Sequence, residues 1–247
     1  MKKIKITLIK MLRARKKFLV GLFMPSKFEK NPIWISNDPN PFMNPTQLTA
    51  DIYKKFQLSG TDKSSNHSYH FPYSFILGKI GKLKSILEIG IGSTSSEIPF
   101  NMGWKQGYRP GSSLFAWRDL GFSKIVGADI DRKILDACDD FECLYVDQTK
   151  RESLVELKDK LNERGLSSLD MIVDDGIHQA EYNLLTFEVL SSNLKSGGIY
   201  VIEDLKQSEL KSIILRLEQL RLSDWHLWIN SYEGENCAML IIEMNRH

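Results

Sequence analysis

The chain has 247 residues, of which 26% are charged and 42% hydrophobic, and this balance predicts a single α/β core of about 180 residues with an appendage. Residues 1–17 contain eight lysines and arginines and no acid, so the total charge of +2 leaves the remainder of the chain at −6. An acidic body argues against nucleic acid as the main partner.

The N-terminal part of the chain differs from the rest in composition. Residues 1–24 mix basic and apolar side chains and predict an amphipathic helix, which either makes a peripheral contact with an anionic membrane or packs on the protein. They do not resemble a signal peptide, and no stretch of the chain is long enough to span a bilayer. Residues 31–45 are rich in proline and asparagine and predict a linker or lid. We therefore expect an N-terminal region over residues 1–57 and a folded domain over residues 58–247.

The first predicted strand of that domain runs from Ser85 to Ile89 and contains Glu88. Gly90 and Gly92 follow it and let the backbone approach a ligand closely, and the hydroxyl-rich residues 93–96 can start a helix. The pattern predicts a nucleotide-binding loop. It also occurs in dehydrogenases and in ordinary turns, and the third glycine of GxGxxG is absent.

Two further strands end in polar side chains. Residues 124–128 form a strand that leads into Asp129, where an acid would bind ribose hydroxyls, and residues 144–146 lead into Asp147 and Gln148. Between the first two strands, residues 100–123 contain aromatic and guanidinium groups that suit sugar stacking or phosphate binding, although Trp117 also fits a core position.

The segment LDMIVDDGIHQ leads the fourth strand into Asp174, Asp175 and His178, and GGIYVIED leads the fifth into Glu203 and Asp204. A helix over residues 179–194 joins the two strands, which therefore run parallel with their carboxyl ends at the same edge of the sheet.

Carboxylates brought together there repel each other unless a cation neutralises them, and oxygen ligands without cysteine favour Mg²⁺, Mn²⁺ or Ca²⁺. His178 suits a general base. In the alternative interpretation Asp175 and Glu203 cap helices and His178 is an ordinary loop histidine.

Beyond this segment, residues 208–222 predict a helix, and residues 225–229 and 238–244 predict a strand pair. The three cysteines, an odd number without metal-site spacing, predict a cytoplasmic location.

These motifs together resemble the class I S-adenosylmethionine-dependent methyltransferases: EIGIG, GADID, VDQ and VDD lie at the carboxyl ends of the first four strands, in that order. The combination RPGSSLFAWRD, GADID, DDGIHQ and GGIYVIED is similar, more narrowly, to the macrocin and mycinamicin sugar O-methyltransferases. The resemblance covers residues 58–205.

The resemblance implies a Rossmann-like α/β fold with a seven-stranded, mostly parallel sheet, helices on both faces and an antiparallel seventh strand beside the sixth. It implies His178 as the catalytic base and Asp175, Glu203 and Asp204 as ligands of a magnesium ion. The implied S-adenosylmethionine contacts are Glu88, Gly90, Ser113, Asp129, Asp147, Gln148 and Asp174. Residues 59–69, SGTDKSSNHSY, resemble a segment that precedes the first strand in related enzymes, and they place His67 and Tyr69 near the cofactor or acceptor, unless the segment is a polar helix cap.

We therefore expect an O-methyltransferase that uses S-adenosylmethionine and Mg²⁺ or Mn²⁺ on a sugar, a sugar nucleotide or a similarly polyhydroxylated acceptor, in surface-polysaccharide or natural-product biosynthesis. A methyltransferase acting on a phosphate-bearing metabolite and a nicotinamide-binding oxidoreductase stay open as alternatives. The resemblance is compatible with a homo-oligomer, for which the chain itself has no pattern.

Overall fold

The computed structural model describes residues 33–36, 46–81, 84–135, 140–222, 224–230 and 236–244. The strands are β1 (Ile33–Ser36), β2 (Ser85–Ile89), β3 (Lys124–Asp129), β4 (Glu142–Tyr145), β5 (Leu169–Asp174), β6 (Leu194–Lys206), β7 (Trp225–Asn230) and β8 (Asn236–Glu243). The α-helices are α2 (Gln47–Ser59), α3 (His70–Ile80), α4 (Ser112–Leu120), α5 (Arg132–Leu135), α6 (Arg151–Glu163), α7 (Ala180–Leu190) and α8 (Leu210–Gln219). Short 3₁₀ turns, η2 (Ser191–Asn193) and η3 (Gln207–Glu209), flank β6.

The strands form one sheet in the order β1-β7-β8-β6-β5-β2-β3-β4. All neighbouring pairs are parallel except β8, which lies antiparallel between β6 and β7. The predicted mostly parallel sheet with an antiparallel strand beside the sixth is therefore confirmed. Strand β1 adds an eighth strand at the edge, within the range that the composition predicted to be a linker.

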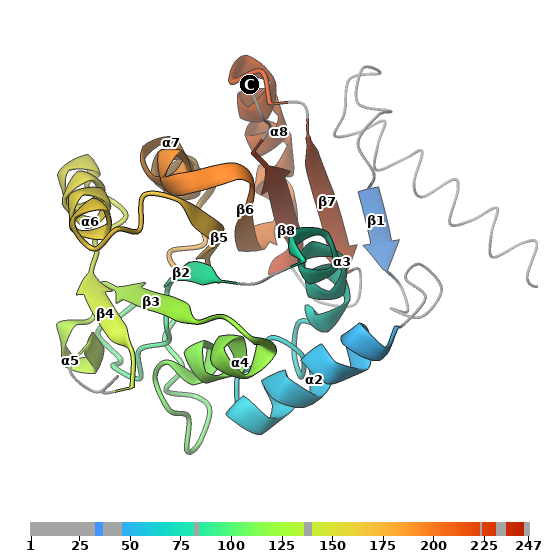
Figure 1. Cartoon of the computed structure of the whole chain (residues 1–247), viewed down its shortest axis with the longest axis vertical. Coiled ribbons are helices and arrows are strands. Elements are labelled where there is room, and N and C mark those ends of the chain that lie inside the picture. Colours follow the sequence, from blue (N-terminus) through green and yellow to red (C-terminus); the bar gives the residue numbers. More distant parts are fainter. Residues whose placement is uncertain are drawn as a thin grey trace, which may run out of the picture.

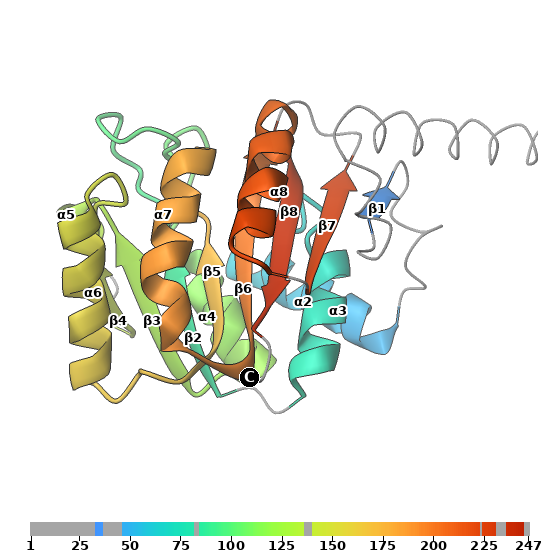
Figure 2. The same ribbon diagram turned by 90° about the horizontal axis from the view of Figure 1, so that it is seen from above.

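Helices cover both faces of the sheet, with α6, α7 and α8 on one side and α2, α3 and α4 on the other (Figures 1 and 2). Successive side chains of a strand point to opposite faces of the sheet. Leu87 and Ile172 therefore pack on the side of α6, α7 and α8, and Ile86 and Met171 pack on the side of α2, α3 and α4. A strand that is buried on both faces has a continuous apolar sequence. This is the pattern from which these strands were predicted.

Three boundaries differ from the predictions, for local reasons. The hydroxyl-rich residues 93–96 form a loop and not a helix, because the Ser93 hydroxyl donates to Asp131 at 2.5 Å. The predicted helix over residues 179–194 ends at Leu190, and β6 begins at Leu194. Gly197 and Gly198, which in the sequence are the stop signal for that predicted helix, lie inside β6, where both pair with the backbone of Met244.

Helix α2 belongs to the domain, although the predicted boundary after residue 57 cuts it. Its Ile52 and Phe56 are fully buried, and the Phe56 ring packs edge-to-face on Tyr73 and Trp117. The predicted basic helix over residues 1–24, and the predicted linker apart from Ile33–Ser36, lie outside the described residues. Within the described ranges, no helix combines the length and apolar character needed to cross a membrane.

Candidate functional site

A cavity of about 640 Å³ lies at the carboxyl ends of β2 to β6, which is where open α/β sheets bind ligands. It is lined by residues at the ends of these strands and in the loops that follow them, including Gly90, Asp129, Gln148, His178 and Asp204. Its volume is in the range of sites that enclose small molecules.

The glycine loop after β2 brings two other loops close together. A side chain at Gly90, which has φ +83°, would lie 2.1 Å from the Asp175 carbonyl oxygen, and one at Gly92 would lie 2.3 Å from the Tyr108 hydroxyl. The Asp175 amide also donates to the Ile89 carbonyl at 2.8 Å. The sequence predicted that Gly90 allows a ligand to come close to the backbone. In the structure the group that lies close to Gly90 is the backbone of the loop that carries Asp175.

Asp129 lies at the end of β3 and lines the cavity, as predicted for a ribose-binding acid. Its Oδ2 accepts the Ile91 amide at 2.9 Å and its Oδ1 accepts the Asp131 amide at 2.9 Å. Each carboxylate oxygen has a second acceptor position. Burial raises the pKa of Asp129, and the amide hydrogen bonds oppose this.

Asp147 and Gln148 both line the cavity after β4, and both are also engaged by the protein. Asp147 accepts the amide and hydroxyl of Thr149, at 3.0 and 2.6 Å, and pairs with Lys150 at 2.7 Å. The Gln148 amide group donates to Asp174 at 2.8 Å and accepts the Ile177 amide at 3.0 Å. Gln148 therefore fixes the loop that follows β5.

Two of the predicted cofactor contacts, Glu88 and Asp174, are fully buried beneath the cavity and do not line it. Glu88 Oε2 accepts hydrogen bonds from the Ser113 hydroxyl and the Trp117 indole, both at 2.7 Å. Burial raises the pKa of Asp174 to about 6. Both therefore lie behind the cavity wall, of which Ser113 is a part.

The loop after β5 presents His178 to the cavity in a strained conformation. His178 has φ +50°, in the left-handed region that non-glycine residues rarely adopt, and its side chain is buried. The Phe100 ring packs edge-to-face on the imidazole at 5.2 Å, and Nδ1 has no hydrogen-bond partner among the described residues.

Glu203 and Asp204 are neighbours in β6, and a bulge brings both to the cavity. The register of β6 against β8 shifts between Ile202 and Leu205, and Asp204 has φ +72°. Regular strand geometry would point adjacent side chains to opposite faces, so the bulge changes the direction of one of them. Both carboxylates line the cavity as a result.

A lysine that the motif analysis did not assign lies at the centre of these acids. Lys63 is 2% exposed, and its ammonium lies 2.6 Å from Glu203, 2.7 Å from Asp175 and 3.1 Å from Glu88. Burial acts to lower the pKa of Lys63, but the three carboxylates outweigh it and hold the pKa well above its usual range. Lys63 is therefore a buried ammonium shared by three strand ends.

Of the three predicted metal ligands, Asp175 and Asp204 each keep one carboxylate oxygen that has no hydrogen-bond partner among the described residues. Glu203 is held on both oxygens, by Lys63 and by the Tyr73 hydroxyl, while Asp204 accepts the Tyr69 hydroxyl on Oδ1 alone. One ligand atom each from Asp175, His178 and Asp204 lies within 4.8 Å of the others. Of the predicted metal ligands, two converge with the predicted base, and Glu203 lies outside that group.

Burial raises the pKa of Asp175 to about 6 and raises that of Glu203 well above its usual value; Lys63 opposes both shifts. The sequence pattern identified the excess of acid but not the lysine that compensates part of it. Lys63 is the lysine of the segment SGTDKSSNHSY, residues 59–69. The predicted cluster of carboxylates needs a positive charge nearby, and this need is the signal that could have identified Lys63.

The segment before α3 contributes two more groups that the sequence placed near the cavity. His67 lines the cavity, with Nδ1 3.6 Å from Asp204 and Nε2 3.7 Å from Asp62, and its ring stacks on Tyr69. Tyr69 is buried and reaches the site through Asp204. Trp117 is fully buried, which agrees with the core interpretation.

The mouth of the cavity is apolar on one side. Ile98, Phe100, Met102 and Trp104 line it, and Phe100 and Trp104 are 47% and 64% exposed. The lining contains six acids, and no lysine or arginine is among the described residues that form it. The acids are Asp62, Asp129, Asp147, Asp175, Glu203 and Asp204.

Comparison with known proteins supports the resemblance inferred from the motifs. The chain is 28% identical over 151 residues to 8-demethyl-8-alpha-L-rhamnosyl tetracenomycin-C 2'-O-methyltransferase of Streptomyces olivaceus, covering 60% of this chain and 36% of the relative. It is 30% identical over 121 residues to demethylmacrocin O-methyltransferase of Streptomyces fradiae, covering 49% of this chain and 27% of the relative. No family model matches the chain.

The structure of MycE, a methyltransferase from the mycinamycin biosynthetic pathway in complex with Mg and SAH, matches with a TM-score of 0.56 at 20% identity. The match covers 79% of this chain and 55% of that one. The chain has a class I methyltransferase fold. The predicted fold class and the predicted resemblance to sugar O-methyltransferases are both confirmed. The chain spans about a third of the length of the curated relatives that it matches.

Proposed function

We propose that this protein is a metal-dependent O-methyltransferase that uses S-adenosylmethionine to methylate a hydroxyl group of a neutral sugar or similarly polyhydroxylated compound. The observation that carries the proposal is the convergence of Asp175, Asp204 and His178 in the cavity that the glycine loop opens. The sulfonium cofactor, when bound, would supply an electrophilic methyl group.

The cofactor side of the cavity fits an adenosine-containing ligand. Asp129 has acceptor positions left for ribose hydroxyls at the end of β3, and Ser113 and Gln148 line the same cavity. Glu88 and Asp174 hold the surrounding side chains from below, through Ser113 and Gln148. These residues would bind and orient the cofactor toward the carboxylate side.

The carboxylate side fits a hard divalent cation. Asp175 Oδ1 and Asp204 Oδ2 have no hydrogen-bond partner among the described residues, and oxygen ligands suit Mg²⁺ or Mn²⁺. A metal ion bound there would lower the pKa of a coordinated hydroxyl group. Tyr69 and Lys63 hold the opposite oxygens of the two aspartates and so fix their directions.

In this proposal His178 takes the proton that a sugar hydroxyl must lose. Its ring atoms lie within reach of the same two carboxylates, and the Phe100 ring limits the directions that it can adopt. A held base and held hydroxyls together reduce the entropy cost of an in-line attack.

The cavity lining favours an acceptor without phosphate. The described lining residues include no lysine or arginine that could bind a diphosphate, and the exposed Phe100 and Trp104 suit the apolar face of a sugar or of a group attached to it. This disfavours the phosphate-bearing metabolite, and the metal and base pair has no role in nicotinamide binding. The name of one curated relative includes a rhamnosyl group, and this supports a sugar hydroxyl as the acceptor.

Transfer of labelled methyl from S-adenosylmethionine tests the proposal, using matched panels of neutral glycosides and nucleotide sugars with Mg²⁺ or with EDTA. We expect transfer to neutral glycosides that EDTA abolishes and Mg²⁺ restores. Transfer that survives EDTA would contradict the metal role, and transfer confined to nucleotide sugars would contradict the neutral acceptor. Calorimetry with S-adenosylhomocysteine separates these results from a failure to bind the cofactor.

A further inference from the structure

In the function proposed above Lys63 only fixes the direction of Asp175, although it is a buried lysine that contacts three acids of the site. It extends from the loop between α2 and α3 and meets carboxylates from the ends of β2, β5 and β6. A lysine is almost never fully buried unless it is paired, and here it has three partners.

The contacts divide the acids into two groups. Glu203 is occupied on both oxygens, by Lys63 and Tyr73, and Glu88 is occupied by Lys63, Ser113 and Trp117. Asp175 gives only Oδ2 to Lys63, so that it belongs to both the lysine group and the open group.

We propose that Lys63 is a resident cation that competes with a divalent metal ion for Asp175 and Glu203, and that it thereby limits the metal site to Asp175 and Asp204 and holds its affinity down. The inference rests on the metal site of the proposed function. Lys63 is a positioning residue in this scheme, since it acts through carboxylates and touches neither the cofactor nor the acceptor.

Two physical effects give the proposal its direction. An ammonium that shares Asp175 with a divalent ion repels that ion, and removing the ammonium also frees one oxygen each on Asp175 and Glu203. Without a metal, by contrast, Lys63 compensates two buried carboxylates, Glu88 and Glu203, and the half-buried Asp175, so its loss destabilises the empty protein.

The test is calorimetric titration with Mn²⁺ of the full chain and of Lys63→Met, which removes the charge and keeps a long apolar side chain. We expect Lys63→Met to bind Mn²⁺ at least about tenfold more tightly, because one positive charge fewer faces the ion. We also expect the variant to unfold at a lower temperature than the parent in EDTA. Added Mn²⁺ should raise the unfolding temperature of the variant more than that of the parent. Unchanged or weaker Mn²⁺ binding by the folded variant, including no binding by either protein, would overturn the proposal.

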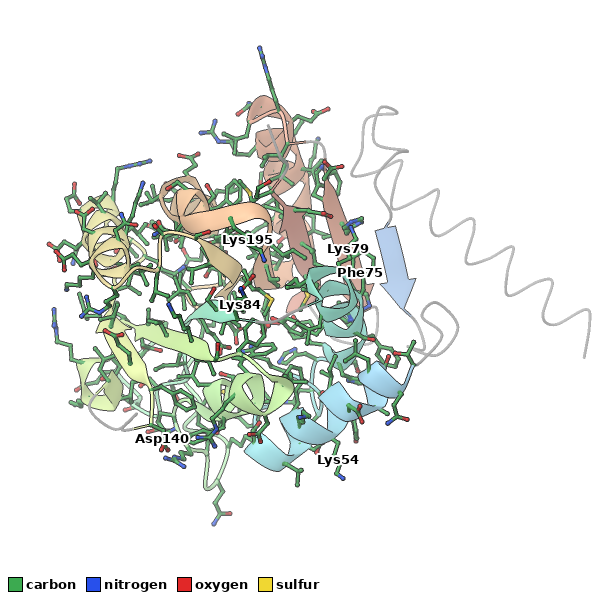
Figure 3. The ribbon with its side chains drawn as sticks, in the orientation of Figure 1. Lys54, Phe75, Lys79, Lys84, Asp140 and Lys195 are labelled. Carbon is green, nitrogen blue, oxygen red and sulfur yellow. The ribbon has the colours of Figure 1, made fainter. Side chains whose placement is uncertain are left out.

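A matched control is Lys195→Met. Lys195 also pairs with a buried aspartate, Asp170, but at the amino-terminal ends of the strands. Figure 3 labels Lys195 and also Lys84, whose backbone amide donates to the same aspartate. Lys195→Met should lower the unfolding temperature without changing Mn²⁺ affinity. If both variants bound Mn²⁺ more tightly than the parent, the gain in affinity would come from the change in net charge alone, and the proposal would be overturned.

If Lys63→Met does not fold, Glu203→Gln tests the same division of the acids. The proposal expects less than about a threefold loss of Mn²⁺ affinity there, against at least about tenfold for Asp204→Asn, because only Asp204 faces the ion directly. Equal losses would overturn it. A parent that binds no Mn²⁺ while Lys63→Met does would refute the metal dependence of the proposed function and leave the role of Lys63 standing.

Discussion

The two ends of strand β5 carry aspartates in opposite circumstances. At the start of the strand, Asp170 is 2% exposed and accepts the Ser85 amide and hydroxyl while pairing with Lys195. Just past its end, Asp175 gives one oxygen to Lys63 and directs the other toward Asp204 and His178.

The difference lies in what remains unsatisfied. At the amino-terminal edge of the sheet, both carboxylate oxygens of Asp170 have hydrogen-bond or ion-pair partners. The ion pair of Asp170 with Lys195 is therefore structural. At the carboxyl-terminal edge the described structure leaves oxygens open, leaves the buried Nδ1 of His178 without a partner and holds two residues at positive φ. Open acceptors next to strained backbone indicate a ligand site, and this contrast between two ends of the same strand can be tested by mutation.

The largest effect should come from His178→Ala. Removing a general base costs about 10²- to 10⁴-fold in rate, so methyl transfer should fall by that factor while S-adenosylhomocysteine binding measured by calorimetry stays within about threefold of the parent. The matched control is His226→Ala, a histidine of β7 that does not line the cavity and should leave the rate per folded molecule unchanged. Full methyl transfer by His178→Ala at neutral pH would contradict the assignment.

Asp204→Asn should be the next most damaging. The change keeps the shape of the side chain but removes charge at the metal site, and we expect methyl transfer at a fixed Mg²⁺ concentration to fall by about 10²-fold. Raising the Mg²⁺ concentration should restore part of the rate. Loss of rate that is independent of Mg²⁺, with cofactor binding lost in parallel, would point to a structural role for Asp204.

Asp170→Asn should have the opposite profile, with stability lost and function kept. An ion-paired, hydrogen-bonded buried carboxylate contributes about 1–3 kcal/mol, which denaturant unfolding would measure at pH 7. Methyl transfer per folded molecule should not change.

The pH dependence of this stability difference has a definite sign. Burial acts to raise the pKa of Asp170, but Lys195 and the Ser85 hydrogen bonds outweigh it and hold the pKa below its usual value of 3.8. The contribution is therefore present above that value and is lost as the pH falls through the lower pKa of the folded protein. A difference between parent and variant that grows on acidification would contradict this account.

Trp104→Ala should have the smallest effect. The exposed indole at the mouth is expected to bind the acceptor equally in ground and transition states, so its loss should raise KM for the acceptor by about tenfold with kcat unchanged. Leu58→Ala, which removes a side chain that is 75% exposed and does not line the cavity, is the control. A fall in kcat with KM unchanged would mean that Trp104 acts in the chemical step.

The sequence predicted the parts of the fold that depend on periodicity. The apolar run of β2 has the bounds that the structure shows, and the strand ends place Asp129, Asp175 and His178 at the same edge. The parallel direction of β5 and β6 followed from the helix that joins them. Such features are set by local pattern and by general rules of chain connection.

The parts that could not be predicted depend on contacts distant in sequence. Lys63 meets Glu203 across 140 residues, and no local pattern encodes that pairing. The bulge at Asp204 depends on pairing with β8, and the loop conformation of Ser93 depends on Asp131. Glu88 and Asp174 carry the expected residue types, but their depth beneath the cavity follows from side chains of α4 and of the loop after β4.

The most direct test of the account is anomalous X-ray scattering from crystals of the full chain grown with Mn²⁺ and S-adenosylhomocysteine. The account predicts one manganese peak in the cavity, bound by Asp175 and Asp204 beside His178, with Glu203 still held by Lys63. A cavity without manganese at saturating concentration, or an ion bound away from these two aspartates, would contradict it.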